Sequence, residues 1–353
     1  MSASLINDKI NLLSLLWAVA LLFLALSFLL CLGIVIRRMH RNRKAKHREK
    51  QRENFQSYIV TLVSGTVVDK HYTDMPPCHI QDKTDIFLHY FQTLKGEKRE
   101  TLQDLIVRSE IEEEIIESTT HGTRGVRMRA VRVLSYLNTQ SSLQVIFKSL
   151  SSVDKYVRLT AMRSLVKRKA VFFLDAIIES CLDAFPADYK LISGILSNFG
   201  REIIEPLENT IRTSENDILT TACLETLVLI MPMQTSLDFR KLMESKSEDV
   251  RAAALSLSAI TKHNHQVNPL LMGLKDSSTR VKIRAVKMAN DLKRSDLTSN
   301  LYELTSDPAL WVRYWALRAI WVSGDPGQQL VSSMTETTSM AESVALEMRS
   351  GYV

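Results

Sequence analysis

The chain has 353 residues, with 45 Lys and Arg against 39 Asp and Glu and a formal net charge of +6. Its 11 glycines are too few for elaborate phosphate-cradling loops in addition to turns, and its four cysteines stand far apart without metal or redox spacing. This cysteine usage fits a reducing cytoplasm. Because the Gly-x-Ser-x-Gly and His-Glu-x-x-His motifs are also missing, the sequence predicts no catalytic residue, cofactor or metal.

The first element predicted in chain order is a membrane-spanning helix over 12–36. This stretch contains no charged residue, and it exceeds the roughly 20 apolar residues that a helix needs to cross a bilayer. It is also longer than a signal-peptide core, and no small-residue cleavage site follows it. A buried core helix is the alternative. Residues 1–11 are expected to form a short extracytoplasmic N-terminus.

A basic collar is predicted over 37–53. Nine Lys and Arg and a single acid, Glu49, lie between 37 and 52, and the rest of the chain holds 36 basic and 38 acidic residues. Positive charge stays on the cytoplasmic side of a span, so we expect a single-pass inner (plasma) membrane protein with its N-terminus outside and its repeats in the cytoplasm. The collar is also expected to attract anionic lipid. The predicted membrane-surface residues are Arg37, Arg38, Arg41, Arg43 and Lys44.

The collar changes the meaning of the net charge, because the positive excess disappears once the collar is set aside. A nucleic-acid patch is the competing interpretation of the collar, but its position directly beside the span argues against it. The basic balance of the whole chain therefore indicates a membrane surface and gives no general support for binding to nucleic acid.

An amphipathic helix and a hinge are predicted over 54–84. Phe55 and Ile59 belong to an apolar stripe at helical spacing that Gly65 ends, and the polar stretch with Pro76 and Pro77 cannot continue a helix. We predict that the segment that follows, 86–116, forms a divergent capping repeat.

Residues 85–325 predict a solenoid, because the sequence repeats itself with a period of about 31 residues, which lies in the range of helical repeat proteins. A Val followed by Arg or Lys, with Ala four positions after the Val, occurs at Val126, Val157, Val250, Val281 and Val312. Two degenerate copies, at Tyr189 and Ile218, fill the gap. Units with such a period bury their apolar faces only by stacking on their neighbours.

Each unit is predicted to be a pair of helices. Val157, Ala161 and Leu165 have the spacing of one helical face, and a second apolar run follows a polar break in most units. The small residue suits a close crossing of two helices. Acids such as Asp154 and Asp276 precede several Val helices, where they can cap free amides. The predicted fold is all-α: a solenoid of helix pairs preceded by one transmembrane helix and followed by a tail over 326–353.

The strings from Asp154 to Ala161 and from Glu248 to Ala254 resemble the Asp-x-x-Val-Arg-x-x-Ala core of bacterial HEAT-like repeats. The layout of anchor, collar, divergent first repeat and regular repeats is similar to that of bacterial inner-membrane HEAT-repeat proteins. The resemblance covers 85–325 and implies fold rather than chemistry, since HEAT-like folds include scaffolds, bilin lyases and DNA glycosylases. It also implies that the repeat Arg bonds an acid of its own or a neighbouring repeat, as a structural ladder.

The Val helices are strongly basic. Thirteen-residue windows that begin at the seven repeat positions hold 18 Lys and Arg but only two acids, Glu225 and Asp291. The third and sixth residues after the Val miss the apolar stripe, so they predict an exposed basic row that lines a partner-binding groove. The row consists of Arg129, Arg132, Arg163, Arg284, Lys287 and Arg318, and Trp315, at an equivalent exposed position, completes the predicted partner-binding residues. A solvated face balanced by acids is the alternative, and Trp315 could instead cap the end of the solenoid.

These observations favour a non-catalytic, membrane-tethered scaffold that binds a cytosolic or membrane-associated protein at the inner face of the membrane. The resemblance implies a partner in signalling or in envelope polysaccharide synthesis. The alternative is a HEAT-like enzyme, because Trp315, Arg318 and Asp325 superficially match the Trp, Arg and catalytic Asp of DNA glycosylases, and bilin lyases share this repeat length. The span and the collar argue against both enzymes.

Overall fold

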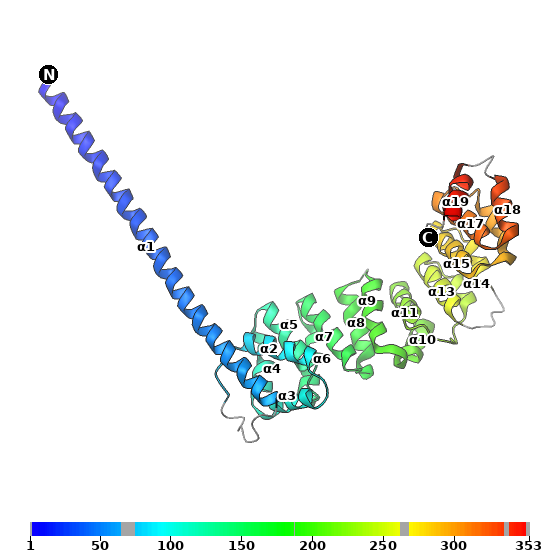
Figure 1. Cartoon of the computed structure of the whole chain (residues 1–353), viewed down its shortest axis with the longest axis horizontal. Coiled ribbons are helices and arrows are strands. Elements are labelled where there is room, and N and C mark those ends of the chain that lie inside the picture. Colours follow the sequence, from blue (N-terminus) through cyan, green and yellow to red (C-terminus); the bar gives the residue numbers. More distant parts are fainter. Residues whose placement is uncertain (1, 65–74, 187, 262–267, 335–338, 351–353) are drawn as a thin grey trace. The chain divides into compact units, whose positions relative to one another are not determined.

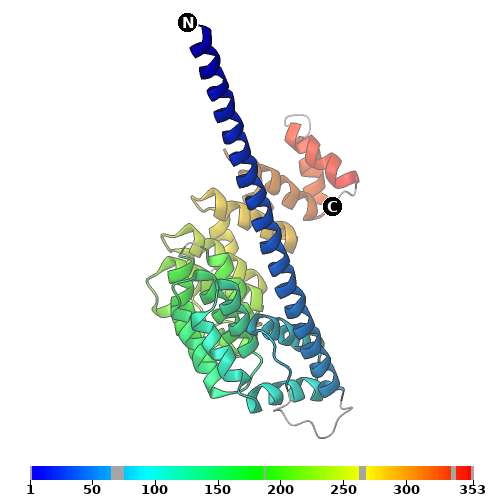
Figure 2. The same cartoon turned by 90° about the vertical axis from the view of Figure 1, so that its left-hand side faces the viewer.

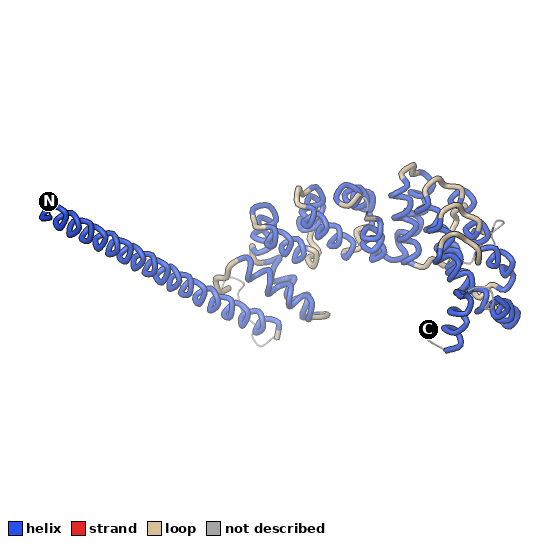
Figure 3. Tube along the Cα trace, turned by 90° about the horizontal axis from the view of Figure 1, so that it is seen from above, coloured by secondary structure: helices blue, strands red, loops and turns tan. Residues whose placement is uncertain are grey.

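The computed structural model describes residues 2–64, 75–186, 188–261, 268–334 and 339–350, with the backbone alone for 2–26. Every regular element in these ranges is a helix, and they contain no strand (Figure 3). The predicted all-α class is therefore confirmed for the described residues. The chain forms two compact units, Met1–Thr139 and Gln140–Val353, each of which is described by itself. Their border falls inside the first regular repeat.

One continuous helix, α1 (Ser2–Val63), runs through the predicted span, the collar and the amphipathic helix (Figure 2). Its last turns pack on α2 (Ile80–Thr93) and α3 (Glu97–Arg108). Phe55 and Ile59 are fully buried there, and the Phe55 ring meets Phe87 edge to face with 5.7 Å between centroids. The predicted amphipathic helix is therefore the packed end of α1, and 65–74 of the predicted hinge segment lie outside the described residues.

The predicted membrane span, 12–36, lies within α1, but the side chains of 12–26 are outside the described residues. In the part of the chain that the structure describes, no helix has the length and apolar character that crossing a membrane requires. The basic side chains from Arg37 to Lys44 are exposed on α1.

The rest of the first unit consists of α4 (Ile111–His121) and α5 (Arg124–Leu134), the helix that carries Val126. The predicted capping repeat is thus three helices, of which α2 and α4 pack on α5. Arg48 fixes α1 to α2, because its Nε and Nη2 donate to the two carboxylate oxygens of Asp82 at 2.5 and 3.0 Å. Arg48, although part of the collar, is therefore a structural residue of this unit.

The second unit is a succession of helix pairs (Figure 1). The first helix of each pair, which we call a Val helix, carries the repeat Val or its equivalent. The Val helices are α7 (Lys155–Lys167), α9 (Tyr189–Leu196), α11 (Asp217–Ile230), α13 (Glu248–Ile260), α15 (Thr279–Leu292) and α17 (Leu310–Val322). The others are α6 (Gln140–Lys148), α8 (Leu174–Ala184), α10 (Ile204–Thr213), α12 (Phe239–Met243), α14 (Pro269–Leu274), α16 (Thr298–Leu304), α18 (Asp325–Met334) and α19 (Ser339–Ser350). Successive Val helices pack on one another from α9 to α17.

The small residue four positions after each repeat Val is completely buried in the regular units, as predicted; these residues are Ala130, Ala161, Ala254, Ala285 and Ala316. At Ala285 the reason is visible. A Cβ placed on Gly273 of α14 would lie 3.1 Å from the Ala285 Cβ and 2.9 Å from a Leu255 methyl group. The two helices therefore approach closely enough to exclude a larger side chain on either one.

The two degenerate units follow a different register from the predicted one. In regular units the Val is the third residue after the helix N-cap, as with Val157 after Asp154. The same rule selects Leu219 in α11, whose N-cap is Asn216, and the predicted Ile218 is 40% exposed. Sequence periodicity alone does not fix where a helix starts. The observed N-cap therefore moves the Val equivalent by one residue, from Ile218 to Leu219.

In α9 the correction is larger. The N-cap is Asp188, so the Val equivalent is Leu191 rather than Tyr189, and the interval from Val157 is longer than in the regular units. Ile195 then stands where the other units have a small residue. Ile195 is bulkier than the Ala of the regular units, so α9 departs from their small-residue pattern at this position.

Candidate functional site

The cation that follows the repeat Val pairs with an acid farther along the chain in three of the Val helices. Arg251 Nε and Nη2 donate to the Asp276 carboxylate at 2.7 and 2.9 Å, while its Nη1 donates to the Ser245 carbonyl at 2.8 Å. Arg251 thereby joins the turn before α13 to the turn before α15. The same sequence interval pairs Arg158 with Asp183 and Lys282 with Asp307. The structural ladder that the resemblance implied is thus present in α7, α13 and α15.

Two of the ladder acids also hold the start of the next Val helix. Asp276 accepts from the Ser278 amide at 2.7 Å, and Asp307 accepts from the Ala309 amide at 2.9 Å. Burial by itself would raise the pKa of Asp276, but the hydrogen bonds from Arg251 and Ser278 leave that pKa below its usual value. The pKa of Asp307 is lowered in the same way, against the effect of burial. Both groups therefore stay ionised and serve the fold.

Three members of the predicted basic row are also paired with acids. In the first unit Arg129 lies 3.2 Å from Asp85; in the second, Arg284 lies 3.0 Å from Glu225 and Arg318 lies 2.9 Å from Glu347. The Arg318 side chain is only 15% exposed. The prediction of an uninterrupted, exposed basic row is therefore wrong at these positions.

The pair of Arg284 and Glu225 shows which face of the stack the row occupies. It joins α15 to α11 and passes over α13, which carries the fully buried Ala253 at the equivalent position. Arg280 reaches farther and donates to the Tyr189 hydroxyl of α9. These hydrogen bonds join Val helices that are not adjacent, so the Val helices must converge on the face that carries the bonds. This face is therefore the inner face of α9 to α15.

Trp315 lies between two cations instead of being free. Lys287 Nζ is 4.7 Å and Arg318 Cζ is 5.2 Å from the centroid of its ring. From α19, Glu347 accepts from the Tyr314 hydroxyl at 2.7 Å and from Arg318. The alternative in which this region caps the solenoid is thus the one that the structure favours, and α19 supplies the cap.

The enzyme alternative gains no geometric support. The Arg318 guanidinium is already held by Glu347, and Asp325 is an exposed residue in the first turn of α18. No contact that the structure describes brings Asp325 to Trp315.

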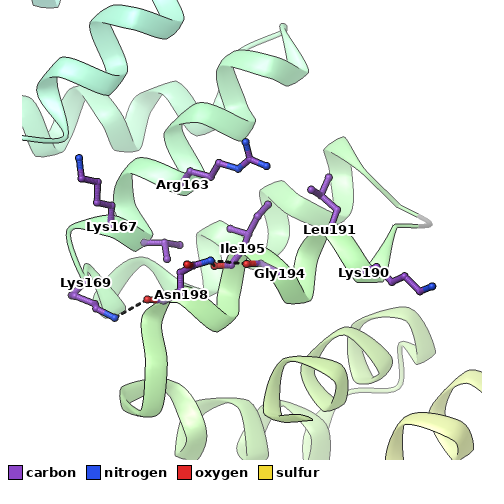
Figure 4. Close-up of a pocket in the computed structure, with 9 residues that line it drawn as sticks. Arg163, Lys167, Lys169, Lys190, Leu191, Gly194, Ile195 and Asn198 are labelled. Atoms are coloured by element: carbon purple, nitrogen blue, oxygen red, sulfur yellow. Dashed lines mark hydrogen bonds between the residues drawn. The ribbon is translucent and has the colours of Figure 1, made fainter. Parts of the chain in front are cut away.

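A basic cleft of about 640 Å³ lies between α7 and α9 (Figure 4). Its cations are Arg163, Lys167 and Lys169 from α7 and the turn after it, and Lys190 from α9; the other lining residues are Val166, Leu191, Gly194, Ile195 and Asn198. No Asp or Glu belongs to this lining. Of the predicted row, only Arg163 contributes to the cleft.

The four cations have different roles. Lys169 has a left-handed backbone, with φ of 54°, and its Nζ donates to the carbonyls of Asn198, at 2.7 Å, and of Phe199. It therefore closes the end of α9. Arg163 extends from α7 toward the α9 wall, whereas Lys190 points outward at the far end of the cleft (Figure 4). Arg163 and Lys190 form no ion pair with any described residue.

The cleft arises where the repeat is irregular. The interval from Val157 to Leu191 is longer than in the regular units, and α9 settles on α7 less closely than α11 settles on α9. Gly194 adds open space, because nothing lies within 4 Å of the position of a Cβ on it. Sequence reasoning missed Lys190 and Gly194, although the failure of the regular interval at this unit marked the place.

The remaining predicted residues stay at the surface. Arg132 is exposed on α5 in the first unit, and Lys287 is exposed on α15 apart from its contact with Trp315. Arg37, Arg38, Arg41, Arg43 and Lys44 are exposed on α1 and form no ion pair with the residues that the structure describes.

No protein-family model and no curated protein matches the chain. Among solved structures, the karyopherin Kap121p aligns with 81% of this chain and 38% of its own, at 15% identity and a TM-score of 0.44. The karyopherin Kap121p bound to the SUMO protease Ulp1p aligns with 75% of this chain and 36% of its own, at 16% identity and a TM-score of 0.43. The chain thus spans about two fifths of the length of Kap121p. Because these TM-scores are below 0.5, the solenoid assignment rests on the helix pairs described above.

Proposed function

We propose that the chain is a non-catalytic, membrane-tethered scaffold whose helical repeats bind a protein partner at the inner face of the membrane. The observation that carries the proposal is the cleft between α7 and α9, where Arg163 and Lys190 have no carboxylate partner among the described residues. On other Val helices, Arg251, Lys282 and Arg284 are held in ladder and row pairs. Cations left without acids at a concave surface steer and select a complementary partner.

The tether is supported by the sequence. Residues 12–36 carry no charge, and nine Lys and Arg follow at once. The exposed cations from Arg37 to Lys44 suit an anionic lipid surface. The bacterial membrane-anchored group that the layout resembles suggests a partner in signalling or in envelope polysaccharide synthesis.

The topology is tested with reporters fused to the C-terminus of the full chain. A fluorescent protein should be bright and alkaline phosphatase inactive, because the collar keeps the repeats in the cytoplasm. An active phosphatase with a dark fluorescent fusion would refute the cytoplasmic location and, with it, a cytosolic partner.

The scaffold is tested by crosslinking in intact membranes, with the full chain compared with Arg163→Glu/Lys190→Glu. A specific protein should be captured by the unaltered chain and lost from the variant, and its capture should weaken with salt. The double variant Arg201→Glu/Arg240→Glu is the matched control, because it changes the charge equally at exposed positions outside the cleft lining.

The enzyme alternative is tested with labelled DNA duplex and the purified chain. Tight, salt-sensitive duplex binding with release of a base, and loss of turnover in Asp325→Asn, would replace the scaffold by a nucleic-acid enzyme. The absence of duplex binding together with cleft-dependent capture of a protein would support the scaffold.

A further inference from the structure

The cleft between α7 and α9 also indicates the chemistry of what it binds. We propose that it binds an extended acidic segment of the partner, in which two carboxylates flank an aliphatic side chain. This inference rests on the proposed function, because it identifies the partner segment at the same site. It uses the arrangement of the cleft, which has a cationic rim, an apolar floor and no acid in its lining.

The rim sets the charge of the segment. Arg163 extends from α7 toward the α9 wall, and Lys190 of α9 stands at the far end of the cleft (Figure 4). A carboxylate that enters the cleft meets these cations and no acid in the lining. A basic segment would be repelled by the same two cations, which therefore also exclude it.

The floor sets the apolar part. Val166, Leu191 and Ile195 line the cleft, and the open space over Gly194 leaves room for a side chain against them. A volume of about 640 Å³ is that of a pocket for a small ligand, so it holds a few side chains rather than a whole helix. The occupant is therefore a short segment.

The backbone of the segment follows from its side-chain pattern. In an extended chain successive side chains point to opposite faces, and residues two apart lie roughly 7 Å apart on one face. A Glu-Leu-Glu sequence thus directs the Leu toward the floor while both carboxylates remain at the rim. In a helical segment the side chains of adjacent residues point only about 100° apart. The Leu and the two Glu side chains would then not point to opposite faces.

The lining also distinguishes a peptide from a nucleic acid. Single-stranded nucleic acids are held by aromatic or Arg planes on which bases stack. The lining contains no aromatic ring, and its only guanidinium is that of Arg163. Aliphatic side chains at the floor favour an aliphatic residue, so an acidic peptide fits the cleft better than a base.

The test is fluorescence anisotropy of the full-length protein in detergent, with a labelled Gly/Ser peptide that contains one Glu-Leu-Glu sequence. The variant Arg163→Glu/Lys190→Glu should weaken binding by about tenfold or more, because attraction becomes repulsion at both positions. The same variant should gain affinity for the matching Lys-Leu-Lys peptide. The control Arg201→Glu/Arg240→Glu should stay within about twofold of the unaltered protein.

Gly194 provides a second test that leaves the charge unchanged. Gly194→Trp fills the cleft from α9 and should weaken the acidic peptide by about tenfold, whereas Gly194→Ala leaves most of the space and should stay within about twofold. Both changes replace a helical Gly by a better helix former, so α9 is not weakened. Circular dichroism of each variant checks that it is folded.

The outcomes separate this inference from the proposed function. The acidic-segment inference is overturned if the peptide does not bind, or if neither the charge reversal nor Gly194→Trp weakens its binding. In that case, capture of a protein in membranes would still support the scaffold. Cleft-dependent binding of the duplex in place of the peptide would overturn both. Loss of the acidic peptide in both cleft variants, with binding retained in both controls, would establish the inference.

Discussion

Two regions of the second unit carry the same kinds of side chain and use them differently. From α13 to α17 the regular repeat interval holds, and Arg251 and Lys282 each reach an acid in the turn before the next Val helix. Between α7 and α9 the interval lengthens, and Arg163 and Lys190 form no ion pair within the described residues. Regular repetition thus uses charge to hold successive turns together, whereas the irregular unit leaves charge available to a partner.

The difference has a simple geometric origin. A cation directly after the repeat Val lies near the start of its helix, where the turns of adjacent units meet and their acids cap amides. In α9 and α11 this position is occupied by Ile192 and Thr220, so the ladder is interrupted there. Arg163, six positions after its Val, is too far along α7 to reach such a turn.

The largest expected effect comes from breaking the ladder. Arg251→Met leaves Asp276 buried without its partner, so it should destabilise the protein by about 3 to 5 kcal/mol. Thermal unfolding followed by circular dichroism reports the change. Arg201→Met, which removes an exposed Arg without an ion pair among the described residues, is the control. Equal midpoints for the two variants would mean that the ladder does not stabilise the repeats.

A smaller effect is expected at the helix crossings. Ala285→Leu should overpack the contact with Gly273, and Ala161→Leu the equivalent position in α7, each at a cost of about 1 to 3 kcal/mol. Ala45→Leu, at an exposed position of α1, should change little. If the midpoints of all three variants match the unaltered protein, the small residue is not required by close packing.

Acid should weaken the ladder less than Arg251→Met, since a protonated carboxyl can still accept a hydrogen bond. The pKa values of Asp276 and Asp307 are lowered in the folded chain from an ordinary value of 3.8. Their contribution to stability is therefore present above that value and is lost as the pH falls through the folded pKa. Unfolding midpoints measured from about pH 6 to pH 3 should decline less steeply in Asp276→Asn/Asp307→Asn. Parallel declines would contradict this assignment.

The smallest effect is expected at the inner face. Arg284→Gln removes the ion pair with Glu225, in which the Arg284 side chain is 35% exposed and the Glu225 side chain 18% exposed. Because solvent screens such a pair, the change should destabilise the protein by only about 0.5 kcal/mol. Chemical unfolding midpoints of this variant and of Arg251→Met provide the comparison. A loss as large as that of Arg251→Met would mean that the pair closing the inner face matters as much as the ladder.

The helix pairs were predictable because their signals are local. The buried positions of Val157, Ala161 and Leu165 follow from periodicity along one helix, and the ladder follows from a resemblance that places the repeat Arg near an acid. The degenerate units were misplaced by one or two positions, because periodicity without the N-cap does not fix where a helix begins. The short helix α12 was missed for lack of length.

The sequence by itself determined the all-helical repeat, the small residue at each crossing and the strongly basic Val helices, since each depends on spacing along the chain. Only the tertiary structure decided which cations are available. Arg284 meets Glu225 of α11 and Arg318 meets Glu347 of α19, both far away in sequence, and those meetings depend on how the helices converge and on where α19 packs. The cleft of Arg163 and Lys190 likewise exists because α9 settles loosely on α7, and packing between helices is not encoded in any single stretch of residues.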